Sequence, residues 1–173
     1  MKESKVSIGL INPKSPDNVG SVMRASGNFR VDSVFYTGAR YPRALKLKSG
    51  SVDMSRKVSQ NIPISEAVCL IDDVPEDMKI VCVEFAENAI PLPEYQHPES
   101  AFYIFGPEDG SISQDLIDRA DAVVYVPTVG CMNLAATVNV VLYDRSAKSS
   151  QRLESNELIR QSRDINNSLK VAQ

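Results

Sequence analysis

Short runs of β-branched and aromatic residues recur along the chain, and such runs are typical of buried strands. Five of them predict strands, at Val6–Ile11, Ser33–Thr37, Ile80–Phe85, Ala101–Phe105 and Ala122–Val126. Helical patterns lie between and after these runs, at Asp17–Asn28, Ser65–Ile71, Ser113–Arg119 and Met132–Ser149. Strands that alternate with helices predict an α/β fold, with helices on both faces of a mainly parallel sheet.

Three of the helical segments carry more specific signals. In Asp17–Asn28, a spacing of 100° per residue puts the apolar and the polar positions on opposite sides. The apolar side holds Val19, Val22, Met23, Ser26 and Phe29, and the open side holds Gly20, Ser21, Arg24, Gly27 and Asn28. Ser111 and Gln114 have the spacing of a capping box for the third helix. Met132–Ser149 is apolar almost all round, which favours a buried helix.

Residues 1–150 have the length of one domain with a single core. Residues 151–173 are polar with sparse leucine and isoleucine, so they form either a weak exposed helix or a disordered tail. No apolar run approaches the roughly 20 residues that span a bilayer, and the first ten residues lack the apolar stretch of a signal peptide. We therefore predict a cytoplasmic protein without a membrane segment.

The reactive residues argue against several kinds of chemistry. The three cysteines, Cys69, Cys82 and Cys131, have no C-x-x-C spacing, and His97 is the only histidine. A disulfide framework, a metal site and a histidine-based triad are therefore poorly supported. The chain has no G-x-x-x-x-G-K-[ST] phosphate loop and no G-x-G-x-x-G motif after a strand. Nucleoside triphosphate hydrolysis and dinucleotide redox chemistry thus lose their main support.

The net charge of -3 is distributed unevenly. Residues 1–60 hold eleven Lys or Arg against four Asp or Glu, whereas residues 61–125 hold two against fourteen. Six basic residues gather in the predicted loop after the second strand: Arg40, Arg43, Lys46, Lys48, Arg56 and Lys57. Such a cluster is either a solvated surface or a docking site for a polyanion.

Three segments that break the local pattern each follow a predicted strand, where parallel α/β sheets bind their ligands. In the first, Asn18 lies near a helix start, and Arg24 can reach back over one turn toward it. The second is F-G-P-E-D-G-S, with Glu108 where the strand opens into a loop. The third places Asn133 at the mouth of the long apolar helix. Each segment taken alone is equally compatible with a structural role, as a cap, a surface ion pair or a turn.

Taken in order, these segments resemble the motifs of the SpoU, or TrmH-like, branch of the SPOUT RNA methyltransferases. The stretch from Asn18 to Arg24 resembles the family's N-x-G-…-R signature, and F-G-P-E-D-G resembles its F-G-P-E-x-G. V-P-T-V-G-C-M-N-L resembles I-P-…-S-[LM]-N-[LV], which precedes an apolar helix ending in L-Y-D or L-Y-E. The resemblance covers roughly residues 6–145 and is to the short members that lack a separate RNA-binding domain.

The resemblance implies an α/β domain in which about residues 80–145 form a deep trefoil knot, and a homodimer as the working unit. It also implies S-adenosylmethionine as the methyl donor, in an apolar slot with few polar groups and no metal. The positions that match the family's donor contacts are Val83, Gly106, Val126, Cys131, Met132 and Leu134.

The implied reaction transfers a methyl group to a ribose 2′-hydroxyl of RNA, with tRNA expected for a short member. Arg24 matches the catalytic arginine, acting as a base or as a stabiliser of the developing oxyanion. Asn18, Glu108 and Asn133 match the other polar positions of the catalytic site. The residues that we expect to contact RNA are Ser21, Arg40, Arg43, Lys46 and Lys48.

Two departures from the family pattern motivate an alternative. Cys131 stands where the family has serine, and the loop between Pro127 and Asn133 is about three residues shorter than the pattern. The alternative is therefore an RNA-binding or donor-binding protein of the same fold with weak or lost catalysis. A flavodoxin-like domain for a small ligand is a third possibility.

Overall fold

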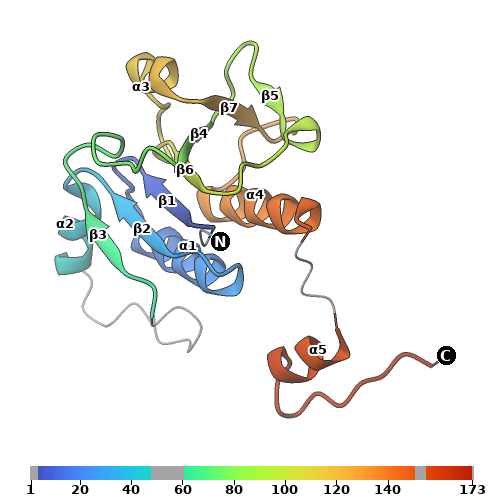
Figure 1. Ribbon diagram of the computed structural model, residues 1–173. Coiled ribbons are helices and arrows are strands. Elements are labelled where there is room, and N and C mark those ends of the chain that lie inside the picture. Colours follow the sequence, from blue (N-terminus) through green and yellow to red (C-terminus); the bar gives the residue numbers. More distant parts are fainter. Residues whose placement is uncertain (1–3, 48–60, 151–154, 173) are drawn as a thin grey trace.

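A parallel sheet forms the centre of the computed structural model, which describes residues 4–47, 61–150 and 155–172 (Figure 1). Its seven described strands lie in the order β3-β2-β1-β6-β4-β7-β5, and every neighbouring pair is parallel. The strands are β1 (Val6–Leu10), β2 (Ser33–Tyr36), β3 (Ile64–Glu66), β4 (Lys79–Val83), β5 (Ile90–Pro91), β6 (Ala101–Phe105) and β7 (Ala122–Tyr125). The predicted α/β fold with a parallel sheet is confirmed.

Helices cover both faces of this sheet. The described helices are α1 (Pro16–Asn28), α2 (Arg40–Leu47), α3 (Gln114–Arg119), α4 (Leu134–Lys148) and α5 (Asn156–Ser162), with a 3-10 turn η1 at Leu92–Glu94. Figure 1 shows α1 and α4 side by side on one face, and the two helices are in contact. None of the described helices is long and apolar enough to cross a membrane.

Alternation along the central strand β6 divides the core into two layers. Tyr103 and Phe105 pack into the larger cluster, which also holds the apolar side chains of α1 and α4. Phe102 and Ile104 point to the other face, where Ile117 of α3 packs against their cluster. Because both faces of β6 are buried, its five residues are apolar throughout.

Helix α1 begins one residue before the predicted start at Asp17 and ends at Asn28, as predicted. The Ser15 side chain caps it by accepting a hydrogen bond from the Asn18 N–H (3.2 Å), and proline follows at the first helical position. Val19, Val22, Met23 and Ser26 are buried as predicted, and Ser21 and Arg24 are exposed. The prediction for Gly27 is wrong, because this residue is buried. Helix α1 packs against α4 as well as against the sheet, so it buries a wider part of its surface than a helix that covers a sheet alone.

The predicted helix Ser65–Ile71 is wrong. Residues 64–66 form the short edge strand β3, in which Ile64 lies opposite Val34 of β2. After the strand, Leu70 and Ile71 pack directly against the sheet without forming a helix. Pairing with a neighbouring strand and burial of two side chains outweigh the weak helical pattern of so short a segment.

Three smaller predictions also differ from the structure. The predicted loop after β2 contains α2, which its buried residue Tyr41 anchors to the core. The N-cap residue of α3 is Ser113, whose side chain makes no capping hydrogen bond, and Gln114 donates to Asp118 (2.7 Å), so the proposed capping box is wrong. Helix α4 is predicted to be a buried helix but is buried on one side only, because Tyr143 on its outer side is 67% exposed. The polar C-terminal segment contains α5, of which no residue is buried.

A buried polar cluster ties α4 to the strand beneath it. The His97 side chain, 4% exposed, is hydrogen-bonded through Nδ1 to the Tyr103 hydroxyl (2.6 Å) and through Nε2 to Asp144 (2.8 Å). Arg145 donates to the carbonyl oxygen of Pro98 (2.6 Å). Burial lowers the pKa of His97 below its usual value of 6.5, and this outweighs the opposing effect of Asp144.

We expect this histidine to make stability depend on pH. Below pH 6.5 the unfolded chain takes up a proton at His97, whereas the folded chain resists it until a lower pH. The free energy of unfolding should therefore fall as the pH drops from 7.5 to 5.5. Urea unfolding across this range checks the slope, and His97→Gln should make it shallower. Equal slopes for the two proteins would contradict the assignment.

Candidate active site

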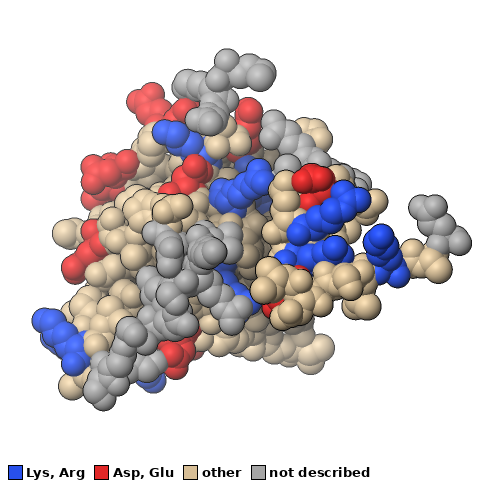
Figure 2. Space-filling model, turned by 90° about the horizontal axis from the view of Figure 1, so that it is seen from below, with Lys and Arg blue, Asp and Glu red and all other residues tan. Residues whose placement is uncertain are grey.

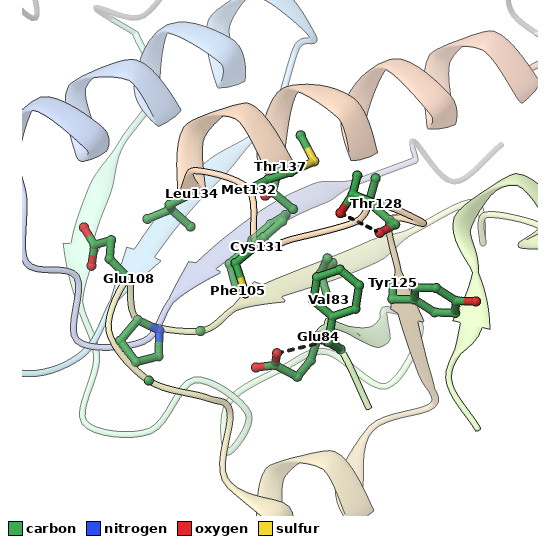
Figure 3. Close-up of a pocket in the computed structure, with 15 residues that line it drawn as sticks. Val83, Glu84, Phe105, Glu108, Tyr125, Thr128, Cys131, Met132, Leu134 and Thr137 are labelled. Atoms are coloured by element: carbon green, nitrogen blue, oxygen red, sulfur yellow. Dashed lines mark hydrogen bonds between the residues drawn. The ribbon is translucent and has the colours of Figure 1, made fainter. Parts of the chain in front are cut away.

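A pocket opens at the carboxyl ends of β4, β6 and β7 (Figure 3). Its volume is about 140 Å³. All six residues expected to contact the donor line it, namely Val83, Gly106, Val126, Cys131, Met132 and Leu134. They come from four separate segments of the chain, which the parallel sheet brings to one edge.

The inner wall of the pocket is apolar. Val83, Phe105 and Leu134 are buried side chains at the ends of β4 and β6 and the start of α4. At Gly106, a Cβ atom would lie 3.3 Å from Glu84 Oε2 and 3.3 Å from Ile112 Cγ1. A side chain at position 106 would therefore crowd Glu84 and Ile112.

Three of the four predicted catalytic residues form a hydrogen-bonded group, which we call the polar junction. Asn18 donates through Nδ2 to Glu108 Oε1 (3.2 Å), and Asn133 donates through Nδ2 to Asn18 Oδ1 (3.0 Å). Asn133 also caps α4, because its Oδ1 accepts from the Ala135 N–H (2.9 Å). The junction thus joins the start of α1, the loop after β6 and the start of α4.

Glu108 is the member of this junction that also lines the pocket. Its carboxylate accepts hydrogen bonds from the backbone N–H groups of Lys14 (2.9 Å) and Ser15 (3.1 Å) as well as from Asn18. Partial burial acts to raise the pKa of Glu108, but these hydrogen bonds outweigh it and lower the pKa. The residue is therefore an ionised anchor and a poor proton acceptor.

Arg24, the fourth predicted catalytic residue, is not one of the hydrogen-bonded residues of the junction. It lies on the exposed side of α1, together with Ser21 and in the same helix as Asn18. Its side chain is exposed to solvent, and Arg24 is not among the residues that line the pocket.

The predicted RNA-binding residues have different surroundings. Arg40 donates from Nη1 to both Asp109 oxygens (2.9 and 2.8 Å) and from Nη2 to the Asn12 carbonyl (2.6 Å). It therefore holds the loop after β6 to the loop after β1. Arg43 and Lys46 are exposed on α2, whereas Lys48 lies outside the described residues, as do Arg56 and Lys57. On the face that Figure 2 shows, the Lys and Arg side chains form separate groups.

Glu84 is a pocket residue that the sequence reasoning missed. It comes directly after β4, and its carboxylate faces the loop after β6 (Figure 3). The predicted strand ran through it to Phe85, which concealed a polar residue at a carboxyl end. The hydroxyl-bearing residues Tyr125, Thr128 and Thr137 also line the pocket. Among the described residues, no group of three or more His, Cys, Asp or Glu side chains is placed to hold a metal ion.

The pocket and the polar junction lie at the carboxyl ends of the strands, where open parallel α/β sheets bind their ligands. The sequence profile of the SpoU rRNA Methylase family matches residues 5–143, so the chain belongs to that family. The predicted membership is confirmed. No curated protein sequence matches the chain significantly.

Solved structures share this fold at low sequence identity. The TrmH/SpoU tRNA modifying enzyme of A. aeolicus aligns with a TM-score of 0.70 and 16% identity, over 92% of this chain and 86% of that one. A structure described for the 2-OH methylation of C/U34 on tRNA aligns with a TM-score of 0.68 and 17% identity, over 86% of this chain and 92% of that one. The AdoMet-bound rRNA methyltransferase from Sinorhizobium meliloti aligns with a TM-score of 0.64 and 14% identity, over 84% of this chain and 57% of that one.

Proposed function

We propose that the protein is an S-adenosylmethionine-dependent methyltransferase that modifies a ribose 2′-hydroxyl of RNA. One observation carries this proposal. Glu108 belongs both to the polar junction and to the pocket lined by all six expected donor contacts, so a donor site and a polar reaction site adjoin. Membership of the SpoU family supports the proposal, as do the RNA-modifying enzymes among the structures that share the fold.

The pocket suits one part of the donor. Its apolar wall matches an adenine ring, and Gly106 and Val126 line it directly after the ends of β6 and β7. A volume of about 140 Å³ is below the ~300–1,000 Å³ of typical ligand sites. The pocket would therefore enclose the adenosine end only in part, with the rest of the donor in its open mouth.

The chain's own residues divide the chemistry between them. Bound S-adenosylmethionine supplies an electrophilic methyl group on a sulfonium. Arginine side chains stay protonated in proteins, so we assign Arg24 to orienting a phosphate and stabilising the oxyanion that forms as the hydroxyl attacks. Glu108 is too well hydrogen-bonded to act as the base, and it holds Asn18 in place beneath the substrate. The hydroxyl proton then passes to solvent at the exposed side of α1.

The proposal has finer parts that the family resemblance implies. They are tRNA as the RNA, a homodimer as the working unit, a trefoil knot over about residues 80–145, one methyltransferase domain over residues 1–150, and a cytoplasmic location. The alignment with a tRNA-modifying enzyme over most of both chains supports the choice of tRNA. Arg43 and Lys46, which are exposed on α2, remain our candidates for phosphate contacts.

Methyl transfer to RNA tests the proposal directly. The protein is incubated with methyl-labelled donor and, separately, with purified tRNA and rRNA, and the RNA is digested to nucleosides. Label in 2′-O-methylated nucleosides of tRNA is the expected result. Donor binding without transfer to either RNA would favour the non-catalytic alternative, and label confined to bases would overturn the assigned reaction. Label in rRNA alone would overturn only the choice of tRNA.

A further inference from the structure

Glu84 is the second carboxylate of the pocket and has a different environment from Glu108. It follows the last residue of β4, Val83, whose side chain forms part of the apolar wall. Its Oε1 accepts from the Phe85 N–H (2.9 Å) and its Oε2 from the Ile112 N–H (2.9 Å). The carboxylate thus lies half-buried between the ends of β4 and β6 (Figure 3).

The hydrogen-bonding capacity of Glu84 is only partly used. An ionised carboxylate has about four acceptor sites, two on each oxygen, and the two backbone N–H groups take one on each oxygen. By contrast, Glu108 accepts from three donors on the α1 side. The hydroxyls of Thr128 and Thr137 each donate within the chain, to the carbonyl oxygens of Gly130 (2.7 Å) and Asn133 (3.0 Å).

The space beside Glu84 is open to a ligand. Gly106 lies next to its Oε2, and a side chain at position 106 would stand 3.3 Å from that oxygen. Both residues line the pocket, and position 106 has no side chain that would crowd this oxygen. A carboxylate with one acceptor site open on each oxygen matches a pair of hydroxyl donors on adjacent carbons.

We propose that Glu84 binds the cis-diol of the donor's ribose, one hydroxyl on each carboxylate oxygen. The inference rests on the proposed function and adds a specificity-determining residue to it. The apolar wall formed by Val83 and Phe105 holds the adenine, and Glu84 selects a ribonucleoside over a deoxyribonucleoside. The two backbone hydrogen bonds fix the carboxylate in advance, which makes the contact geometrically specific.

Calorimetry with S-adenosylhomocysteine and its 2′-deoxy and 3′-deoxy analogues tests this role. Wild-type protein should bind the ribose form about 10- to 100-fold more tightly than either deoxy form, as expected for a hydrogen bond to a charged group. Glu84→Ala should bind all three with similar, weak affinity, and Glu84→Gln should retain part of the preference. Glu87→Gln, at an exposed acidic residue of the next loop, is the matched control and should bind as wild type does.

The outcomes separate the two proposals. If Glu84 only holds the loop after β6 in place, Glu84→Ala weakens all three ligands by the same factor and keeps the wild-type preference, which overturns the inference alone. If wild-type protein binds all three ligands equally well, the inference is likewise overturned and the proposed function is not. Absence of binding of S-adenosylhomocysteine to wild-type protein overturns the proposed function together with the inference. Thermal melting of each variant confirms that it is folded.

Discussion

Replacing Arg24 by alanine is expected to reduce the turnover number of methyl transfer by about 100- to 1,000-fold, the usual effect of removing one group that stabilises an oxyanion. Arg24 is exposed on α1 and takes no part in the hydrogen bonds of the polar junction. Its removal should therefore leave the fold and donor binding unchanged. Single-turnover transfer to tRNA, with donor affinity measured in parallel, checks both parts of this expectation.

Two further variants sharpen the test of Arg24. Arg24→Lys keeps the charge but loses the planar pair of donors, so activity should recover only in part. Lys5→Ala is a control, because Lys5 is exposed and precedes β1 at the opposite end of the strand from the pocket. An Arg24→Ala protein that transfers methyl groups at the wild-type rate would refute the role assigned here.

Replacing Glu108 by alanine is expected to damage both stability and activity. The N–H groups of Lys14 and Ser15 and the amide of Asn18 lose their acceptor, and water can replace only part of it. We expect the free energy of unfolding to fall by about 1–3 kcal/mol, the range for leaving such groups unsatisfied. The turnover number should fall as well, because the Asn18 side chain then keeps only its hydrogen bond with the Asn133 side chain within the junction and is held less firmly.

Urea unfolding and transfer assays measure these two effects. Glu87→Ala is the control, since Glu87 is an exposed acidic residue outside the junction. Glu108→Gln keeps one acceptor oxygen and should lie between the alanine variant and wild type in both measurements. If Glu108→Ala unfolds at the same urea concentration as wild type, the junction does not stabilise the fold and its assigned role is wrong.

The sequence predicts well those strands that are long enough, and buried enough, to require a run of several apolar residues. The central strands are buried on both faces, so β6 is a continuous apolar run, and β1 and β4 are apolar except for Ser7 and the exposed Lys79. The edge strands β3 and β5 are three and two residues long, too short to carry a pattern of their own. They are strands only because β2 and β7 are already in place to pair with them.

The candidate site shows the same division. Asn18, Glu108 and Asn133 each follow a strand, and the geometry of a parallel sheet is enough to bring them to one edge. The ion pair between Arg40 and Asp109 could not be predicted in this way. Asp109 lies 69 positions away along the chain, in a loop whose path no local sequence pattern predicts. A basic cluster in the sequence therefore contains one residue that holds two loops together as well as residues that face solvent.

The polar junction also limits when during folding a site of this kind can exist. Its hydrogen bonds join residues 90 and 115 positions apart, so a chain still emerging from the ribosome has no site until Asn133 has been made and α4 has docked on α1. Contacts between residues so distant in sequence form slowly, since a long loop must close before any bond is gained. We therefore expect partly folded protein to have no activity, and activity during refolding to appear only once α4 has docked on α1.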